Sequence, residues 1–196
     1  MKGKIALLDY FDGKEAAALL IDGELHDFFA EPGANAPGSI FKVKVKHQIK
    51  GSGGIFVESP DGDFFLHKTK GITAGDVILV QVISYGDREK LPRVTTKLLF
   101  KSRYVIVTPF NEGLNIAKNI QDNERRIQLK QLVVEGLNHI PYGMIMRSSC
   151  ASANKSEIIS DCKNTIMTAQ NVLSAEDKQM GLIPVSYTHL TLPTKQ

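Results

Sequence analysis

Short strand-like runs separated by tight turns follow one another between residues 39 and 97. They read IFKVKVKHQI, GGIFVES, DFFLHK, DVILVQVISY and RVTTKLL. The run FKVKVK alternates strictly, so Phe41, Val43 and Val45 share one face of a strand while three lysines share the other. Four or five short strands with tight turns in about sixty residues predict a small Greek-key barrel of the OB type.

The basic residues of the chain are unevenly distributed. The formal net charge is +3, but residues 1–37 carry a net charge of −4 and residues 38–103 a net charge of +6. A local excess of lysine and arginine is typical of nucleic-acid binding, and it is also common on a solvated surface. The lysine face of FKVKVK likewise has two explanations, contact with RNA or an edge strand that lysines protect from pairing. Charge alone leaves both open.

The segments on either side of the barrel predict an α+β chain. KIALLDY and EAAALLIDGELHDFF read as β-strands, with Asp22-Gly23 as a hairpin turn. The stretch AEPGANAPGS then predicts a linker and a domain boundary near residue 37. After the barrel, RYVIVTP and GMIMRSSC read as further strands.

Two amphipathic helices are predicted in the last part of the chain. Asp122 can cap a helix that runs to about Leu137, and Asn154 with Glu157 forms the pattern of a capping box. Apolar residues recur at helical spacing, as Leu129, Leu132, Val133 and Leu137 in the first helix and Ile158, Cys162, Ile166, Ala169 and Leu173 in the second. The carboxylates in DNERR are better explained by capping and the helix dipole than by acid/base catalysis.

Several other classes of function find little support in the sequence. No run of about 18 apolar residues is present, and acidic residues interrupt the N-terminus where a signal peptide needs an apolar stretch, so a cytoplasmic protein is expected. Cys150 and Cys162 lie in no CxxC or metal-ligand spacing, which predicts buried free thiols and no metal site. His67 and His139 have no partners at catalytic spacing and are expected to be non-catalytic.

The last twelve residues, VSYTHLTLPTKQ, fit nothing before them. They resemble the in-frame translation of a transposon-end adapter that is used in sequencing libraries, so residues 185–196 are left out of the fold prediction. We therefore expect a natural reading frame that was cut near Pro184, in a chain that is a fragment of a longer protein.

The order of several motifs is similar to that of a known family. The runs MKGKIALLDYFDGKEAAALLIDGEL, GGIFVESPDGDFFLHK and FKSRYVIVTP, and then GMIMRSSC before a capped helix, resemble the N-terminal half of the ribonuclease E/G family, short proteobacterial type. The resemblance implies incomplete RNase H-like strands at 1–37 and an inserted S1 domain of OB fold at 38–99. It also implies a sensor subdomain for the RNA 5′-monophosphate at 100–184.

The same resemblance implies an endoribonuclease whose chemistry lies further along the protein. In that family a DNase I-like subdomain with Mg²⁺-binding aspartates follows the sensor, as does a zinc-binding cysteine motif that joins protomers. Neither has a counterpart in this sequence. The chain itself is therefore expected to bind single-stranded RNA without cutting it and to hold no cofactor. The resemblance is compatible with a homo-oligomer of the full-length protein.

Stacking residues of the family's S1 domain fall on Phe56 and Phe65, and a basic residue that helps to hold the strand falls on Lys90. Stacking of a base on an aromatic ring tolerates any RNA sequence. The residues alone allow another explanation, because Phe64 and Phe65 point to opposite faces of a strand and one ring of that pair must fill the barrel.

The grip on the terminal phosphate falls on Arg147, whose guanidinium offers two parallel donors to phosphate oxygens. Without the family, a structural salt bridge explains Arg147 as well. Ser148 stands where the family has threonine and keeps the hydroxyl, and the backbone contribution falls on Ser102 and Ile106. Ser102 replaces a usual glycine and can crowd the terminal base. In NIAKNI, Lys118 keeps one charge of a basic pair.

Two functions from different classes compete at this point. The first is the RNA-binding portion of a single-strand-specific endoribonuclease, which positions RNA for Mg²⁺-dependent hydrolysis of a phosphodiester. The second is a stand-alone S1-type module that regulates RNA processing or translation. A generic OB domain for protein partners comes third, because the aromatic and lysine arrangement disfavours it.

Overall fold

The computed structural model describes residues 3–11, 13–30, 35–49, 53–67, 69–86, 90–174 and 179–185. Residues 1–36 and residues 37–196 form two separate compact units. The adapter-like tail lies outside the described residues except for Val185, which packs against a hydrophobic core of the second unit. In the described part of the chain, neither helix is long and apolar enough to cross a membrane.

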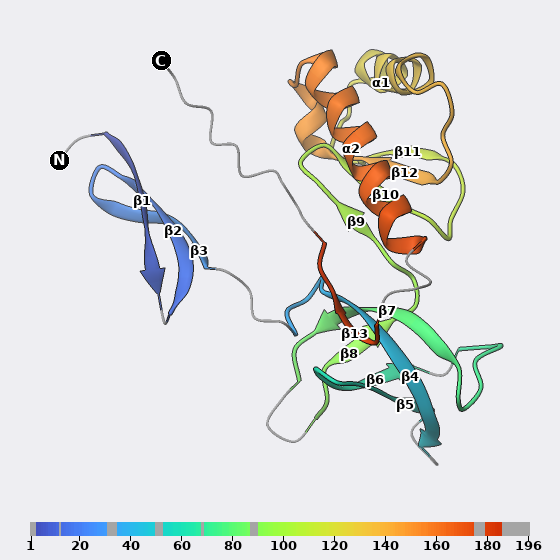
Figure 1. Cartoon of the computed structure of the whole chain (residues 1–196). Helices are drawn as coiled ribbons and strands as arrows, with labels where there is room; N and C mark the ends of the chain where they lie inside the picture. The colour runs from blue at the N-terminus through green and yellow to red at the C-terminus, as the bar shows by residue number, and fades with distance from the viewer. Residues whose placement is uncertain are drawn as a thin grey trace. The chain divides into compact units, whose positions relative to one another are not determined.

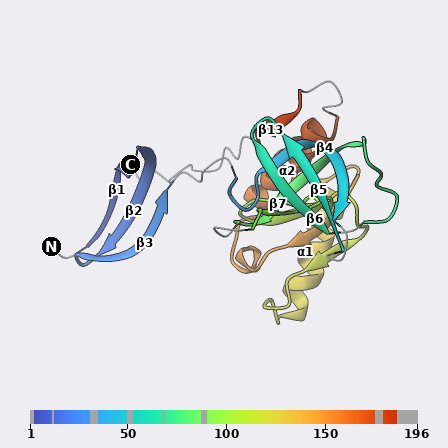
Figure 2. The ribbon, with the colours of Figure 1, turned by 90° about the horizontal axis from the view of Figure 1, so that it is seen from below.

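The first unit is an antiparallel sheet in the order β1-β2-β3 (Figures 1 and 2). Its strands are β1 (Lys4–Phe11), β2 (Lys14–Ile21) and β3 (Glu24–Ala30). Asp22 and Gly23 both have positive φ angles, 54° and 90°, as a type I′ turn requires, so the predicted hairpin is confirmed. Large apolar side chains stay exposed, among them Leu7, Leu8, Tyr10, Phe11, Leu25 and Phe28. The described part of this sheet therefore has no buried core of its own.

A closed five-stranded barrel forms the first part of the second unit. Its strands are β4 (Ile40–Ile49), β5 (Gly54–Ser59), β6 (Gly62–His67), β7 (Val77–Ser84) and β8 (Arg93–Thr95). They hydrogen-bond in the order β4-β5-β6-β8-β7, and β4 also pairs with β7 to close the barrel. Only β6 and β8 run parallel in this barrel. The arrangement is consistent with the predicted OB-like barrel.

The alternating residues of β4 fill this barrel. Phe41, Val43 and Val45 are buried, as predicted, and their partners in the core are Ile55, Val57, Phe64, Leu66, Val80, Val82 and Val94. β4 hydrogen-bonds to β5, β7 and β13. The interpretation of its lysines as protection of an edge strand is therefore wrong, because β4 is paired on both sides.

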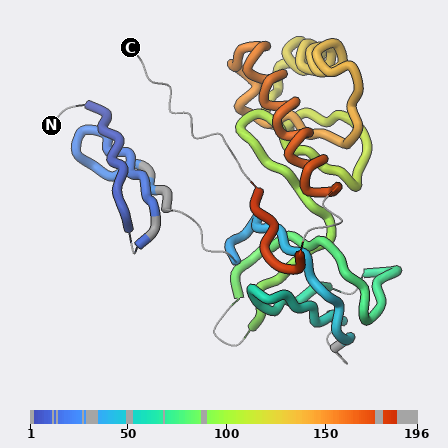
Figure 3. Tube along the Cα trace, in the orientation of Figure 1, coloured from blue at the N-terminus to red at the C-terminus, as the bar shows by residue number. Residues whose placement is uncertain are grey.

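The second part of this unit is a sheet in the order β11-β12-β10-β9 with two helices on one face (Figures 1 and 3). The elements are β9 (Phe100–Lys101), β10 (Val105–Thr108), β11 (Leu114–Ile116), α1 (Asn123–Gly136), β12 (Gly143–Met146) and α2 (Lys155–Leu173). Phe100, Val107 and Met144 are buried in one core with the helices. Lys101 and Ile106, which alternate with buried residues, lie on the opposite, open face.

The two predicted helices are present, but only one is capped as predicted. Asp122 accepts hydrogen bonds from the amides of Glu124 and Arg125, so the first cap is confirmed. Asn154 is the N-cap residue of α2, yet its side chain makes no capping bond. The Glu157 carboxylate instead accepts a 2.8 Å hydrogen bond from the Tyr104 hydroxyl. The predicted capping box is wrong because Glu157 has a tertiary partner.

A short strand after α2 returns to the barrel. β13 (Gly181–Ile183) pairs antiparallel with the first residues of β4, beyond the end of β5. Asp61, in the turn between β5 and β6, accepts a 2.6 Å hydrogen bond from the Leu182 amide. Ile183 is buried in the core beneath the two helices. Three residues thus tie the end of the described chain to the barrel wall.

Candidate nucleic-acid interface

The three phenylalanines of the β5–β6 hairpin divide between the two faces of the barrel wall. Phe64 is fully buried, and its ring packs on Phe41 with centroids 4.7 Å apart. Phe56 and Phe65 are direct register partners on the outer face and remain partly exposed. One ring of the hairpin therefore fills the barrel, and two form a pair on its outer surface.

A β-bulge adds a third ring to this pair. Register shifts in β4 between Val45 and His47, so Val45 pairs inward with Val57 while His47 pairs with Phe56. The His47 and Phe56 rings are stacked, with centroids 5.5 Å apart and planes 9° from parallel. Bulges commonly redirect a side chain in this way. His47, Phe56 and Phe65 therefore form an aromatic row across β4, β5 and β6, the strands in the foreground of Figure 2.

The Phe65 ring is held in place by its neighbours. A Cβ atom placed on Gly54 would lie 2.1 Å from Cε2 of Phe65, so the ring lies directly over the glycine. The His67 ring meets the Phe65 ring edge-on, with centroids 5.2 Å apart. Gly54 thus leaves the space that the ring occupies, and apart from the glycine itself no local pattern indicates this requirement.

The predicted basic residue Lys90 is exposed beside β8. Two residues later, the Pro92 carbonyl accepts a 2.9 Å hydrogen bond from the Phe65 amide. Arg93 follows and pairs in register with Phe65 across the β6–β8 ladder. The chain that carries Lys90 is therefore joined directly to the strand of the aromatic row.

Arg147 lies at the end of β12 and contacts the turn between β9 and β10. Its guanidinium Nη1 donates a hydrogen bond to the Ser102 carbonyl, and its amide donates one of 2.8 Å to the Tyr104 carbonyl. The Ser149 hydroxyl donates to the carbonyl of Arg103. Arg147 is exposed, and within the described residues its guanidinium makes a hydrogen bond to a backbone carbonyl and no salt bridge.

A buried carboxylate holds the same turn from the other side. Asp161 of α2 accepts a hydrogen bond of 2.5 Å from the Ser102 hydroxyl and one of 2.8 Å from the Tyr104 amide. Tyr104 in turn donates to Glu157, and this hydrogen bond, with burial, raises the pKa of the Tyr104 hydroxyl. The Ser102 hydroxyl therefore points to α2, and crowding of a terminal base would not come from that group.

The remaining predicted residues lie near this turn. Ile106 is half-buried on the open face of the sheet, and its register partner in β9 is Lys101. Ser148 is exposed and begins the short 3-10 helix Ser148–Ala151. Ser102, Arg147 and Ile106 thus belong to one end of the sheet β11-β12-β10-β9, whereas Phe56 and Phe65 belong to the barrel wall.

Sequence reasoning missed a residue that fixes the chain after Arg147. The Arg125 guanidinium donates to the Cys150 carbonyl at 2.7 Å and to the Ala153 carbonyl at 3.0 Å. These bonds hold the 3-10 helix that follows Arg147 against the start of α1. The arginines of DNERR indicate that this segment can donate hydrogen bonds to a neighbouring loop, but no local pattern identifies the loop.

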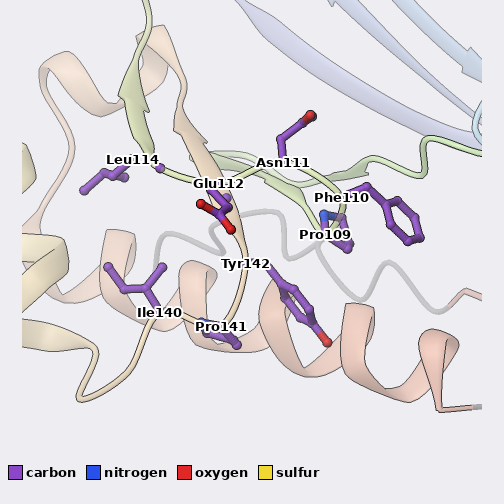
Figure 4. A pocket seen from close by; sticks show the side chains of 10 residues that line it. Pro109, Phe110, Asn111, Glu112, Leu114, Ile140, Pro141 and Tyr142 are labelled. Carbon is purple, nitrogen blue, oxygen red and sulfur yellow. The ribbon is translucent and has the colours of Figure 1, made fainter.

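A hollow of about 560 Å³ lies at the opposite end of this sheet. Figure 4 shows it between the segment Pro109–Leu114 and the segment Ile140–Tyr142. Arg147 follows β12, whereas this hollow adjoins Gly143 at its start. No predicted site residue lines it. Within the described residues, no three His, Cys, Asp or Glu side chains gather where they could hold a metal ion.

The chain is similar to one protein family and to several known proteins. The model of the Ribonuclease E/G family matches residues 100–190. A Ribonuclease E/G-like protein of Pyropia yezoensis is 30% identical over 96 residues, which cover 49% of this chain and 19% of that protein. Ribonuclease E of a Nostoc species is 22% identical over 75% of this chain and 24% of its own length. Ribonuclease G of Haemophilus influenzae is 25% identical over 88% of this chain and 40% of its own length. The chain spans less than half of each of these relatives.

Proposed function

We propose, because this chain belongs to the ribonuclease E/G family, that it forms the RNA-binding portion of a single-strand-specific endoribonuclease. In this proposal the barrel is an S1-type domain, the sheet with its two helices is the 5′-sensor, and residues 1–36 belong to an RNase H-like subdomain. The chain positions single-stranded RNA for hydrolysis in the cytoplasm, and the relatives' additional length supplies the hydrolytic groups.

The observation that carries this proposal is the pairing of Phe56 with Phe65 on the outer face of the barrel. In OB folds, strands two and three form the usual binding face for oligonucleotides, and β5 and β6 are those strands here. Two partly exposed rings side by side offer flat apolar surfaces to successive bases. Phe64 already fills the barrel, so neither outer ring is needed there.

Arg147 supports a second contact, at the RNA 5′ end. One of its guanidinium nitrogens is oriented by the Ser102 carbonyl, which leaves other donors of the planar group for phosphate oxygens. Ser148, next in the chain, adds an exposed hydroxyl, and Ile106 an apolar side chain on the open face. We assign this group to the terminal 5′-monophosphate.

No hydrolytic step is assigned to this chain. The chain spans less than half of each relative, and we assign the aspartates that hold Mg²⁺ in the family to the additional length of those relatives. What these residues do in the proposal is to stack bases, hold a phosphate and orient the strand.

The test is fluorescence anisotropy of the whole chain with a single-stranded RNA and with the matching duplex, at one stated salt concentration because phosphate contacts depend on salt. The RNA is recovered from the same samples, with Mg²⁺ present, and its length is measured on a gel. We expect tighter binding of the single strand and intact RNA. Absence of RNA binding would reject the proposal.

A further inference from the structure

The segment that joins the barrel to the second sheet is strongly basic. Residues 90–103 contain five lysines and arginines and no acidic residue. Arg93, Lys97 and Lys101 are exposed, and none of the three has an ion-pair partner among the described residues. Cations that no carboxylate neutralises create a positive potential, which attracts a polyanion.

Arg93 stands at the end of the aromatic row. Phe56 of β5 pairs in register with Phe65 of β6, and Phe65 pairs in register with Arg93 of β8. Val94, the next residue, is buried in the barrel, so Arg93 lies on the outer face together with the rings. The row of outward side chains across the barrel wall therefore ends in a cation.

Lys97 and Lys101 line one hollow of about 330 Å³ beyond this point. Thr95, on the same strand face as Arg93, lines it too, and Leu99 lies between the two lysines. The side chain of the buried Gln81 holds the backbone of Leu99 with two hydrogen bonds. It accepts one of 2.9 Å from the Leu99 amide and donates one of 3.0 Å to the Leu99 carbonyl. The backbone that carries the two lysines is thus rigidly held.

The far end of this segment reaches the phosphate-binding group. Lys101 is adjacent to Ser102, whose carbonyl accepts from Arg147. It also pairs in register with Ile106 on the open face of the sheet. A chain of exposed cations therefore begins beside Phe65 and ends beside Arg147.

We propose that Arg93, Lys97 and Lys101 form a phosphate track that holds the sugar-phosphate backbone of single-stranded RNA between the aromatic row and Arg147. This proposal rests on the RNA-binding function proposed above and assigns it a path. The rings bind bases in any sequence, and the cations contact the phosphates between them. The two exposed lysines favour a polyanion over a protein partner, although Pro37, Val82, Ile83 and Leu99 also line the hollow.

The test compares two double variants that each remove two positive charges. Lys97→Gln with Lys101→Gln removes part of the track, and Lys130→Gln with Lys163→Gln removes exposed lysines of α1 and α2 as the control. Affinity for a 5′-hydroxyl single-stranded RNA is measured between about 50 and 200 mM salt. Each lost phosphate contact lowers the salt slope by about 0.7 for a single strand, so the track variant should lose about sevenfold less affinity over this range than the wild type.

The control variant should keep the slope of the wild type, and both should unfold at the same urea concentration as the wild type. An equal slope in the track variant and the control overturns the phosphate track. A third variant, Phe56→Ala with Phe65→Ala, separates the two proposals. If this variant loses RNA binding while the track variant and the control have equal slopes, the phosphate track is wrong and the RNA-binding function still holds. A wild type that binds no RNA overturns both proposals together.

Discussion

The Ser102 hydroxyl donates a 2.5 Å hydrogen bond to Oδ2 of Asp161, a buried carboxylate on α2. The same oxygen accepts from the Tyr104 amide at 2.8 Å. One side chain of a helix therefore holds both ends of a three-residue turn, and Arg147 contacts the carbonyl of that turn from the other side. The position of the proposed phosphate site depends on a residue that cannot touch the phosphate itself.

Asp161→Ala should lower the free energy of unfolding and loosen this turn. It leaves the buried Tyr104 amide without its acceptor, at about 1–3 kcal/mol, whereas the Ser102 hydroxyl can still donate to the Val105 carbonyl at 3.1 Å. Ser102→Ala is the matched control, since Asp161 keeps the Tyr104 amide, and it should cost less. Urea denaturation measures both, and equal midpoints for Asp161→Ala and the wild type would contradict the role of the carboxylate.

The three phenylalanines of the hairpin should respond to truncation in opposite ways. Phe56→Ala and Phe65→Ala should each weaken binding of single-stranded RNA by about 1–3 kcal/mol, roughly 5- to 150-fold, with little effect on folding. Phe64→Ala should cost about 3–5 kcal/mol of stability, because it empties the barrel core. Anisotropy and urea denaturation separate the two effects. Normal RNA binding by Phe56→Ala with Phe65→Ala would remove the basis of the stacking assignment.

Gly54→Ala should weaken RNA binding, although Gly54 is not one of the residues that we propose to contact RNA. The new methyl group collides with the Phe65 ring, which must move off its position over Gly54. The check is a double-mutant cycle measured by anisotropy. In a Phe65→Ala background the same change should have little further effect, and full additivity of the two losses would show that Gly54 acts by another route.

The two cysteines should be inert in the folded protein. Burial raises the pKa of the Cys150 thiol to about 11 and that of Cys162 to about 12. At pH 8 neither thiol should react with an alkylating reagent until urea unfolds the chain. Mass spectrometry counts the modified thiols, and rapid alkylation of the native chain would show that the core around α2 opens.

The same pKa values predict a loss of stability in alkali. Raised thiol pKa values favour the neutral form in the folded state, so their contribution is complete below pH 9, the ordinary thiol value, and falls as the pH rises toward 11 and 12. Urea midpoints measured from pH 8 to higher pH should therefore decline. In Cys150→Ser with Cys162→Ser, the urea midpoint should decline less above pH 9 than in the wild type. This comparison does not depend on the stability of the variant at pH 8.

Local sequence patterns predict most of the strands and both helices, because alternation and helical spacing of apolar residues indicate which face of each element is buried. The β11 and β13 strands were not foreseen, since three residues are too few to show a period. The bulge that turns His47 onto Phe56 was hidden for another reason. The unbroken alternation of FKVKVK continues to Lys46, and only pairing with β5 shows where the register shifts.

Pairwise partners across the fold were the least accessible part of the site. The family resemblance assigns both Phe56 and Phe65 to base stacking, but their identity as register partners follows from the hairpin geometry. Asn154 and Glu157 have the spacing of a capping box, and yet Glu157 bonds Tyr104, which lies 53 residues away. Asp161 in the second helix gave no local signal, because its partners are on another element.

The most direct test of the central claim is the affinity of the whole chain for one single-stranded RNA with either a 5′-monophosphate or a 5′-hydroxyl, at one salt concentration, for the wild type and Arg147→Ala. Charge-assisted hydrogen bonds contribute about 1.5–3 kcal/mol, so the monophosphate should bind roughly 10- to 150-fold more tightly to the wild type. Arg147→Ala should bind both RNAs alike, while Lys130→Ala should keep the difference. Equal binding of the two RNAs by the wild type would contradict the assignment of Arg147 to the RNA 5′ end.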